Sequence, residues 1–244
     1  MNLNELFAAQ DRTLAQHLSS SKLFSDTFNV ISGAYSLITD MVPNLAFQWE
    51  KKGVLALFSV EILTAASVAT RLALSGNTPE SLGILRFAIE RCAQLLFVVS
   101  EKRYKTAMCE IDKGFDQVSY EEAFSSMGDL GHRIKRLHGE ISEAAAHASA
   151  TRMNWYSSQQ EDKIYFGPGY QHEDERVAVC LEWCLDSLHI VIHCVRLAHE
   201  QDEVAFKWDE RCSSLSQSYV TLKKQYDLKL GREQPPKGSD AATA

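Results

Sequence analysis

Arg86 and Glu90 carry opposite charges and stand four residues apart in a stretch that is otherwise strongly apolar. Residues at i and i+4 lie on one face of an α-helix, so these two side chains can pair. The surrounding helix is apolar on most sides, which is typical of a helix in the middle of a bundle. Because a buried charge needs a partner, the pattern predicts a structural ion pair or a polar centre in which Arg86 binds an anionic group. A solvated face is the third interpretation.

A second polar set lies on the helix expected over residues 130–150. Its members share one face at spacings of i, i+4, i+7 and i+11: Arg136, Glu140, Glu143 and His147. Glu143 could orient His147, as a carboxylate orients a general base. The face is opposite the apolar stripe of the helix, which favours a solvent face with salt bridges. A run of alanines permits close packing, however, and we expect Glu143 or His147 within hydrogen-bonding reach of the ion pair described above.

Arg133 and His138 match the Arg-x4–6-His spacing of some ribonucleases. Such a match arises by chance about once in a chain of this composition, so it has little weight alone. Arg133 also belongs to a local basic cluster with Lys135 and Arg136, and such a cluster can bind the phosphates of a nucleic acid.

A fourth set has metal-ligand spacing on one helix face: Glu182, Asp186, His189 and His193. A di-iron bundle needs a second carboxylate-x-x-His helix, and the sequence has none. We therefore interpret this face as a polar helix flank, with a metalloenzyme built on the two histidines as the alternative, and expect no metal. Glycine-rich nucleotide motifs and the nucleophile elbow are absent, so no cofactor is expected.

The elements that must position these residues are helices. The chain has 244 residues, of which 45% are hydrophobic, and only 12 glycines and 5 prolines, too few for a many-stranded β protein. The net charge of −7 argues against a surface that binds nucleic acid everywhere. Six cysteines without a C-x-x-C pair, and the lack of a signal peptide, predict a reducing, cytoplasmic location. Residues 53–70 are apolar but contain Glu61, which favours a buried central helix over a membrane span.

The sequence predicts one all-α domain over residues 1–230, a bundle of about seven or eight helices, with a disordered tail at 231–244. Pro43 should end one helix, and Thr78-Pro79 should begin another. An aromatic stretch near 152–171 should form a short loop or hairpin. Apolar spacing predicts the longer helices over residues 3–17, 23–41, 45–75, 78–109, 130–150, 173–205 and 210–230.

Two stretches carry a resemblance to a known family. The first is Leu85-Arg86-Phe87-Ala88-Ile89-Glu90, and the second runs from Ile141-Ser142-Glu143 to His147-Ala148-Ser149, before Phe166-Gly167-Pro168. This order resembles a family of bacterial all-helical proteins of unknown function, with an Arg-x-x-x-Glu helix, a Leu-Ser…His segment and an aromatic loop. The resemblance implies a helical fold and a polar centre of Arg86, Glu90 and His147, but no reaction. A looser similarity, at the level of fold, is to HEPN domains, many of which are ribonucleases in toxin or phage-defence systems.

Two functions follow as expectations. The first is a helical binding or assembly module of unknown ligand in a bacterial defence or stress system, acting as a homodimer or with a protein partner. The second is a HEPN-like ribonuclease or toxin-type effector with Arg133 and His138 at a dimer interface.

Overall fold

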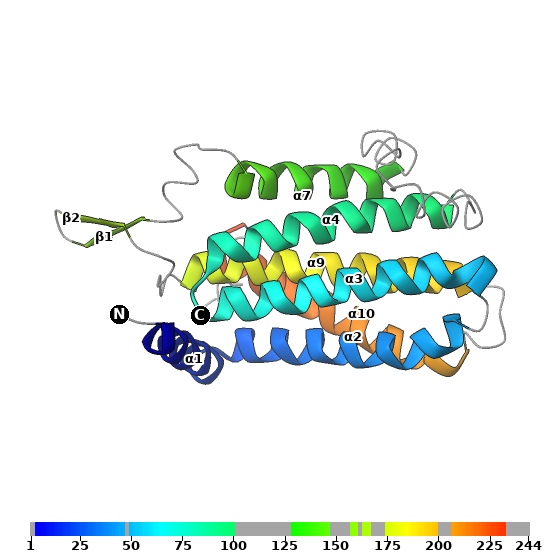
Figure 1. The fold of residues 1–244 in the computed structure, drawn as a ribbon, viewed down its shortest axis with the longest axis horizontal. Coiled ribbons are helices and arrows are strands. Elements are labelled where there is room, and N and C mark those ends of the chain that lie inside the picture. The colour runs from blue at the N-terminus through cyan, green and yellow to red at the C-terminus, as the bar shows by residue number, and fades with distance from the viewer. Residues whose placement is uncertain are drawn as a thin grey trace, which may run out of the picture.

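The computed structural model describes residues 3–46, 49–100, 128–146, 157–160, 163–166, 174–199 and 206–232. These residues form an all-α bundle, as the sequence predicts, with one small antiparallel hairpin beside it (Figure 1). The described helices are α1 (Leu3–Ser20), α2 (Lys22–Ala46), α3 (Trp49–Leu74), α4 (Thr78–Ser100), α7 (Gly128–Ala146), α9 (Asp174–His199) and α10 (Phe206–Lys229). The hairpin strands are β1 (Ser157–Gln160) and β2 (Lys163–Phe166), and their register pairs Ser157 with Phe166.

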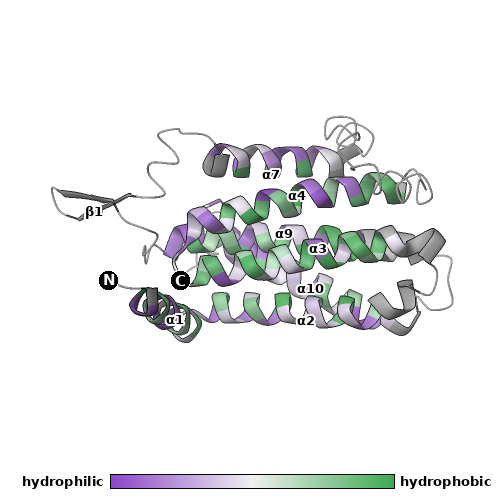
Figure 2. Cartoon of the chain, viewed as in Figure 1, coloured by the Kyte–Doolittle hydropathy of each residue, from purple (hydrophilic) through white to green (hydrophobic). Residues whose placement is uncertain are grey.

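The long helices lie side by side, and α1 crosses one end of the bundle (Figure 1). The centre is formed by α3, α4 and α9, which pack on one another. On one side α7 covers α4, and on the other α2 and α10 pack together and against α9. Figure 2 shows hydrophobic residues along much of α3 and α4, whereas α7 and α10 mix hydrophilic and hydrophobic positions. The outer helices α7 and α10 therefore carry a larger share of polar residues than α3 and α4.

The core follows from the apolar spacing. Leu85, Ile89 and Cys92 of α4 are fully buried, and Ile134 and Ile141 of α7 are buried on the side that meets α4. Burying a side chain of this size contributes about 1.5–3 kcal/mol. The apolar stripe predicted for residues 130–150 is thus the face that docks α7.

Buried cysteine side chains form part of the core on α4, α9 and α10. Cys92, Cys180, Cys184 and Cys212 are unoxidised and buried. Cys180 and Cys184 of α9 are both fully buried. Burial raises the pKa of Cys180 well above its usual value and that of Cys184 to about 12. These cysteines are core residues.

Among the described helices, α3 is long and apolar enough over Leu55–Leu74 to cross a membrane, and more than half of that stretch is buried inside the bundle. Glu61 within it lies 3.2 Å from the Nε atom of Arg91 on α4. Arg91 also lies over the rings of Phe58 and Phe87, at 5.6 and 5.1 Å from their centroids. The carboxylate in the apolar helix therefore has a charged partner within the protein, as a central bundle helix requires.

Two helix boundaries are informative. Pro43 does not end its helix as predicted, because α2 continues to Ala46. Proline removes one N–H and crowds the carbonyl four residues earlier, and in the last turn of a helix this affects few hydrogen bonds. The end of α3 is as predicted: Gly76 has a φ of 82°, and its N–H and that of Asn77 bond back to Ala73 and Leu72. This is a Schellman turn, which requires a left-handed residue.

Candidate functional site

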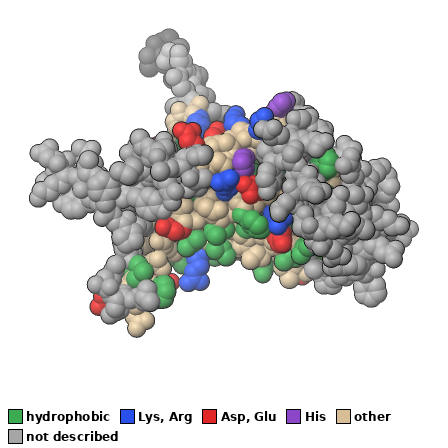
Figure 3. Space-filling model, turned by 45° about the horizontal axis from the view of Figure 1, so that its top comes forward, with side chains coloured by type: hydrophobic (Ala, Val, Ile, Leu, Met, Phe, Trp, Pro, Cys, Tyr) green, Lys and Arg blue, Asp and Glu red, His purple; other side chains and the backbone are tan. Residues whose placement is uncertain are grey.

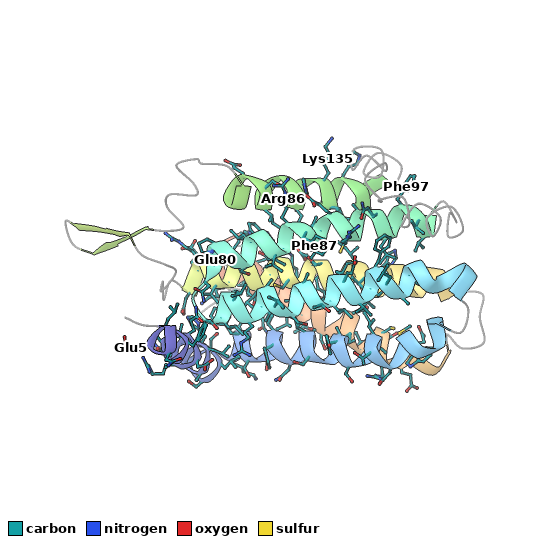
Figure 4. The ribbon with its side chains drawn as sticks, viewed as in Figure 1. Glu5, Glu80, Arg86, Phe87, Phe97 and Lys135 are labelled. Atoms are coloured by element: carbon teal, nitrogen blue, oxygen red, sulfur yellow. The ribbon has the colours of Figure 1, made fainter. Side chains whose placement is uncertain are left out.

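Three side chains from two helices meet at the seam between α4 and α7. Arg86 donates from Nε to Oε1 of Glu90, at 3.1 Å, one turn along α4. Nε2 of His138 on α7 lies 3.2 Å from the same oxygen. We call these three residues the seam centre. Figure 4 shows Arg86 between the two helices, whereas Lys135 points away from the bundle on the outer side of α7.

The seam centre is partly open to solvent. The exposed fractions of the side chains are 40% for Arg86, 19% for Glu90 and 21% for His138. In the part of the chain that the structure describes, only the Nε donor of Arg86 is engaged by Glu90, and a guanidinium has five N–H donors. Arg86 can therefore bind a carboxylate or phosphate from outside while Glu90 holds its stem in place.

His138 is set up for proton transfer as well as for binding. A carboxylate on one ring nitrogen fixes the orientation of an imidazole. Glu90 supplies that carboxylate here, 3.2 Å from Nε2. A histidine with this support can accept a proton from a hydroxyl group or donate one to a leaving group.

The structure brings together only part of the predicted set. Arg86 and Glu90 pair, and the helix of residues 128–146 packs on theirs, as expected. The histidine that reaches them is His138. Glu143 is exposed, and His147 lies outside the described residues. Among the ribonuclease candidates, His138 is in the seam centre, and the side chain of Arg133 is outside the described part.

A signal in the sequence could have found His138. It stands four residues after Ile134 and three before Ile141, on the apolar stripe that docks α7. A polar residue in such a stripe must meet a polar partner on the facing helix. Arg136 and Glu140, which lie on the opposite face, are 77% and 49% exposed and pair with each other at 3.6 Å. That pair has the geometry of a solvated salt bridge, the interpretation that the periodicity favoured for this face.

The predicted polar flank on α9 is wrong for its first two members. Glu182 is fully buried and bonds through Oε1 to Nζ of Lys223, at 2.6 Å, and to a guanidinium nitrogen of Arg232, at 2.5 Å. Asp186 accepts from Lys223 at 2.8 Å and from the hydroxyl of Tyr219 at 2.7 Å. These partners come from α10 and the turn after it, 33 to 50 residues along the chain, so sequence spacing on α9 alone could not predict them.

The same cluster contains His189, whose ring stacks on Tyr219 with centroids 4.0 Å apart. His193 is exposed, one turn further along α9. Within the described residues, no three His, Cys, Asp or Glu side chains are arranged to hold a metal ion. The carboxylates of this face instead bind cationic side chains of the protein.

Charged side chains gather on the face of the molecule that carries α7. Figure 3 turns α7 toward the viewer and shows basic, acidic and histidine side chains gathered there, above a band of hydrophobic side chains. Burial lowers the pKa of Arg232, but the hydrogen bond to Glu182 and the charges of Glu182, Asp227 and Glu140 outweigh it and raise the pKa overall. Arg232 is therefore firmly cationic in this setting.

Comparison with known proteins does not assign the chain to a family. No protein family, curated protein or solved structure matches the chain.

Proposed function

We propose that the protein is a helical binding module whose seam centre receives an anionic ligand. The observation that carries the proposal is the shared carboxylate of Glu90, which holds Arg86 and His138 side by side at a partly exposed seam. The guanidinium donors of Arg86 that Glu90 does not engage can bind a carboxylate or phosphate. The resemblance to bacterial helical proteins and to HEPN domains supports a role in a bacterial defence or stress system in the cytoplasm.

A titration tests the anion site. Isothermal calorimetry with inorganic phosphate, and with a short single-stranded RNA, should give saturable binding to the wild-type protein. Arg86→Gln and His138→Gln should each weaken it at least tenfold. His132→Gln is the matched control, because His132 is an exposed histidine on the same helix. Equal affinity in all four proteins, or no saturable binding of either probe, would contradict the proposal.

A second candidate function is a metal-independent ribonuclease, and the Glu90–His138 contact favours it. His138 would accept the proton of a ribose 2′-hydroxyl, whose oxygen attacks the adjacent phosphorus. The bond from phosphorus to the 5′-oxygen breaks, the 5′-oxygen takes up a proton from water, and a 2′,3′-cyclic phosphate remains. Arg133, five residues earlier on α7, would stabilise the negative phosphorane.

The ribonuclease candidate predicts cleavage products that end in cyclic phosphate. His138→Ala should abolish cleavage, and His132→Ala should leave it unchanged. If wild-type protein leaves RNA intact, or if both variants cleave at the wild-type rate, this candidate is excluded.

The assembly part of the proposal is a homodimer. Leu57, Val60 and Val68 of α3 are between 37% and 44% exposed, and their spacing places them on one face of the helix. Phe87 of the neighbouring α4 is 41% exposed. An apolar stripe of this kind is self-complementary when a second copy is turned about a two-fold axis. A second copy of the chain is therefore the partner that we propose for it.

A further inference from the structure

Gly83 lies inside α4, about one turn before the seam centre, and is exposed to solvent. A glycine inside a helix destabilises the helix relative to alanine, because glycine loses more conformational freedom on folding. Such a glycine often serves a close packing contact or a function. A Cβ atom at Gly83 would meet no atom within 4 Å, and the backbone there is helical. Packing among the described residues therefore does not require this glycine.

Two side chains border this open position. Arg86 and Phe87 follow Gly83 by three and four residues, so they lie one turn further along α4, on either side of it. The Cα–Cβ bonds of a helix tilt toward its N-terminus, so both side chains lean over the turn that contains Gly83. Arg86 lies on the side of α7, and Phe87 lies on the side of α3 (Figure 4). We call the open space over Gly83, between these two side chains, the Gly83 gap.

Both borders of the Gly83 gap have accessible binding groups. The side chain of Arg86 is 40% exposed, and only its Nε atom is engaged by another described residue. Phe87 is 41% exposed. The guanidinium of Arg91 lies over the ring of Phe87, 5.1 Å from the centroid, and donates to Gln94 at 2.8 Å, so the ring is supported from within the protein. The exposed part of this ring can contact a second planar group, and the remaining donors of Arg86 can bind an anion.

We propose that the anion bound at the seam centre carries a planar aromatic ring, and that this ring lies in the Gly83 gap against Phe87. The inference rests on the proposed function, because Arg86 remains the group that binds the anion. Aromatic side chains bind planar rings by stacking, which requires open space beside the side chain. The missing side chain at Gly83 leaves that space. An aryl phosphate or a nucleotide would use all three residues, whereas free phosphate would use only Arg86.

Calorimetric titration with matched pairs of ligands tests the aromatic part. Phenyl phosphate and methyl phosphate differ by a ring, as do AMP and ribose 5-phosphate. In the wild-type protein, the ringed member of at least one pair should bind about fivefold more tightly or better than its ringless partner. The pair that shows this gain identifies the ring as an aryl group or a nucleobase.

Three variants locate the ring. Phe87→Ala and Gly83→Leu should each remove the gain from the ring and keep the wild-type affinity for methyl phosphate. Phe28→Ala is the matched control, because Phe28 is a 37% exposed phenylalanine on α2, and it should leave the gain unchanged. Leucine is a better helix former than glycine, and the space at Gly83 is open, so Gly83→Leu should be at least as stable as the wild type in thermal denaturation. A loss of the gain in this variant then cannot come from unfolding.

Two outcomes would overturn this inference and leave the proposed function standing. In the first, inorganic phosphate binds, but the two members of each pair bind equally. In the second, the gain from the ring persists in Phe87→Ala or in Gly83→Leu, which would place the ring elsewhere. If inorganic phosphate and all four ligands fail to bind, the proposed function is contradicted, and the inference with it.

Discussion

Glu90 is the residue on which the seam centre depends, because it accepts from both neighbours. When Arg86 is removed, Glu90 keeps His138, and its side chain is already 19% exposed with Arg86 in place. The loss in the free energy of unfolding should therefore resemble the loss on breaking a partly solvated ion pair. We expect Arg86→Ala to lower the free energy of unfolding by about 1 kcal/mol, well below the roughly 3–5 kcal/mol of a fully buried pair.

Urea denaturation measures this loss. Arg71→Ala is the control, because Arg71 forms an ion pair with Asp11 in which both side chains are at least 66% exposed. Its effect should stay within about 0.5 kcal/mol. A loss of about 3 kcal/mol or more in Arg86→Ala would show that the seam is closed to water and that the pair serves packing alone.

At the residue level, the sequence predicted contacts between nearby positions but not contacts between positions far apart in the chain. The Arg86–Glu90 pair lies within one helix turn, so helical periodicity alone was enough to find it. The contact of Glu90 with His138 spans 48 positions and depends on how α7 is rotated and shifted against α4. The contacts of Glu182 likewise depend on where α10 ends, which no local pattern on α9 encodes.

At the scale of elements, the end of α10 positions the side chain of Arg232. Gly231 has a φ of 68°, and the N–H groups of Gly231 and Arg232 bond back to Leu228 and Asp227. In this second Schellman turn, which ends α10, the guanidinium of Arg232 reaches Glu182. The sequence assigned Gly231 and Arg232 to the tail. The rest of that predicted tail lies outside the described residues.

Glycine substitutions test the turn. A Cβ at Gly231 would meet no atom within 4 Å, so Gly231→Ala should cost only the strain of a left-handed residue, about 1 kcal/mol. Gly139 in α7 is equally open but helical, so Gly139→Ala should stabilise by about 0.4–1 kcal/mol. Thermal denaturation of the two variants measures the difference. A stabilising Gly231→Ala would show that the turn does not require a left-handed residue.

The raised pKa values of the buried thiols on α9 predict how the free energy of unfolding changes at high pH. Burial raises the pKa of Cys184 from 9.0 to about 12, so its thiol ionises more readily in the unfolded chain than in the folded one. The stabilisation is complete below pH 9 and is lost as the pH rises from 9 toward 12. The slope for this group approaches about 1.4 kcal/mol per pH unit. Cys180 and Tyr226, whose pKa values burial also raises, add to it.

Chemical denaturation at pH 8, 9, 10 and 10.5 measures this dependence. Cys184→Ala should lower stability at every pH, because it leaves a cavity, but should show a shallower decline above pH 9. An unchanged slope in the variant would mean that Cys184 remains neutral in the unfolded chain or is accessible in the folded one.

At the scale of the whole molecule, the position of a helix in the centre or at the outside of the bundle and the side that it buries were predictable, because both follow from apolar spacing. The spacing placed α3 and α4 in the centre and α7 on its apolar stripe, as the structure has them. Which helices become neighbours depends on packing of the complete bundle. The exposed apolar residues of α3 likewise depend on how the complete bundle packs. The spacing shows that α3 is apolar on most sides, but it does not predict which side other helices leave exposed.

That uncovered side of α3 predicts self-association. Val60 and Val68 are 42% and 44% exposed on it, and Val220 of α10 is 50% exposed elsewhere. Sedimentation velocity should show a concentration-dependent dimer for the wild-type protein. Val60→Lys and Val68→Lys should each shift it to monomer, because a lysine ammonium in an apolar interface is desolvated without a partner. Val220→Lys, with the same change in side chain, should leave the dimer intact. If the wild-type protein is monomeric at every concentration, or if Val220→Lys dissociates the dimer as strongly, the α3 stripe is not the interface.

If the protein cleaves RNA through Arg133 and His138 of two copies, the α3 variants should lose cleavage to the same extent as they lose the dimer, and the Val220 variant should retain cleavage.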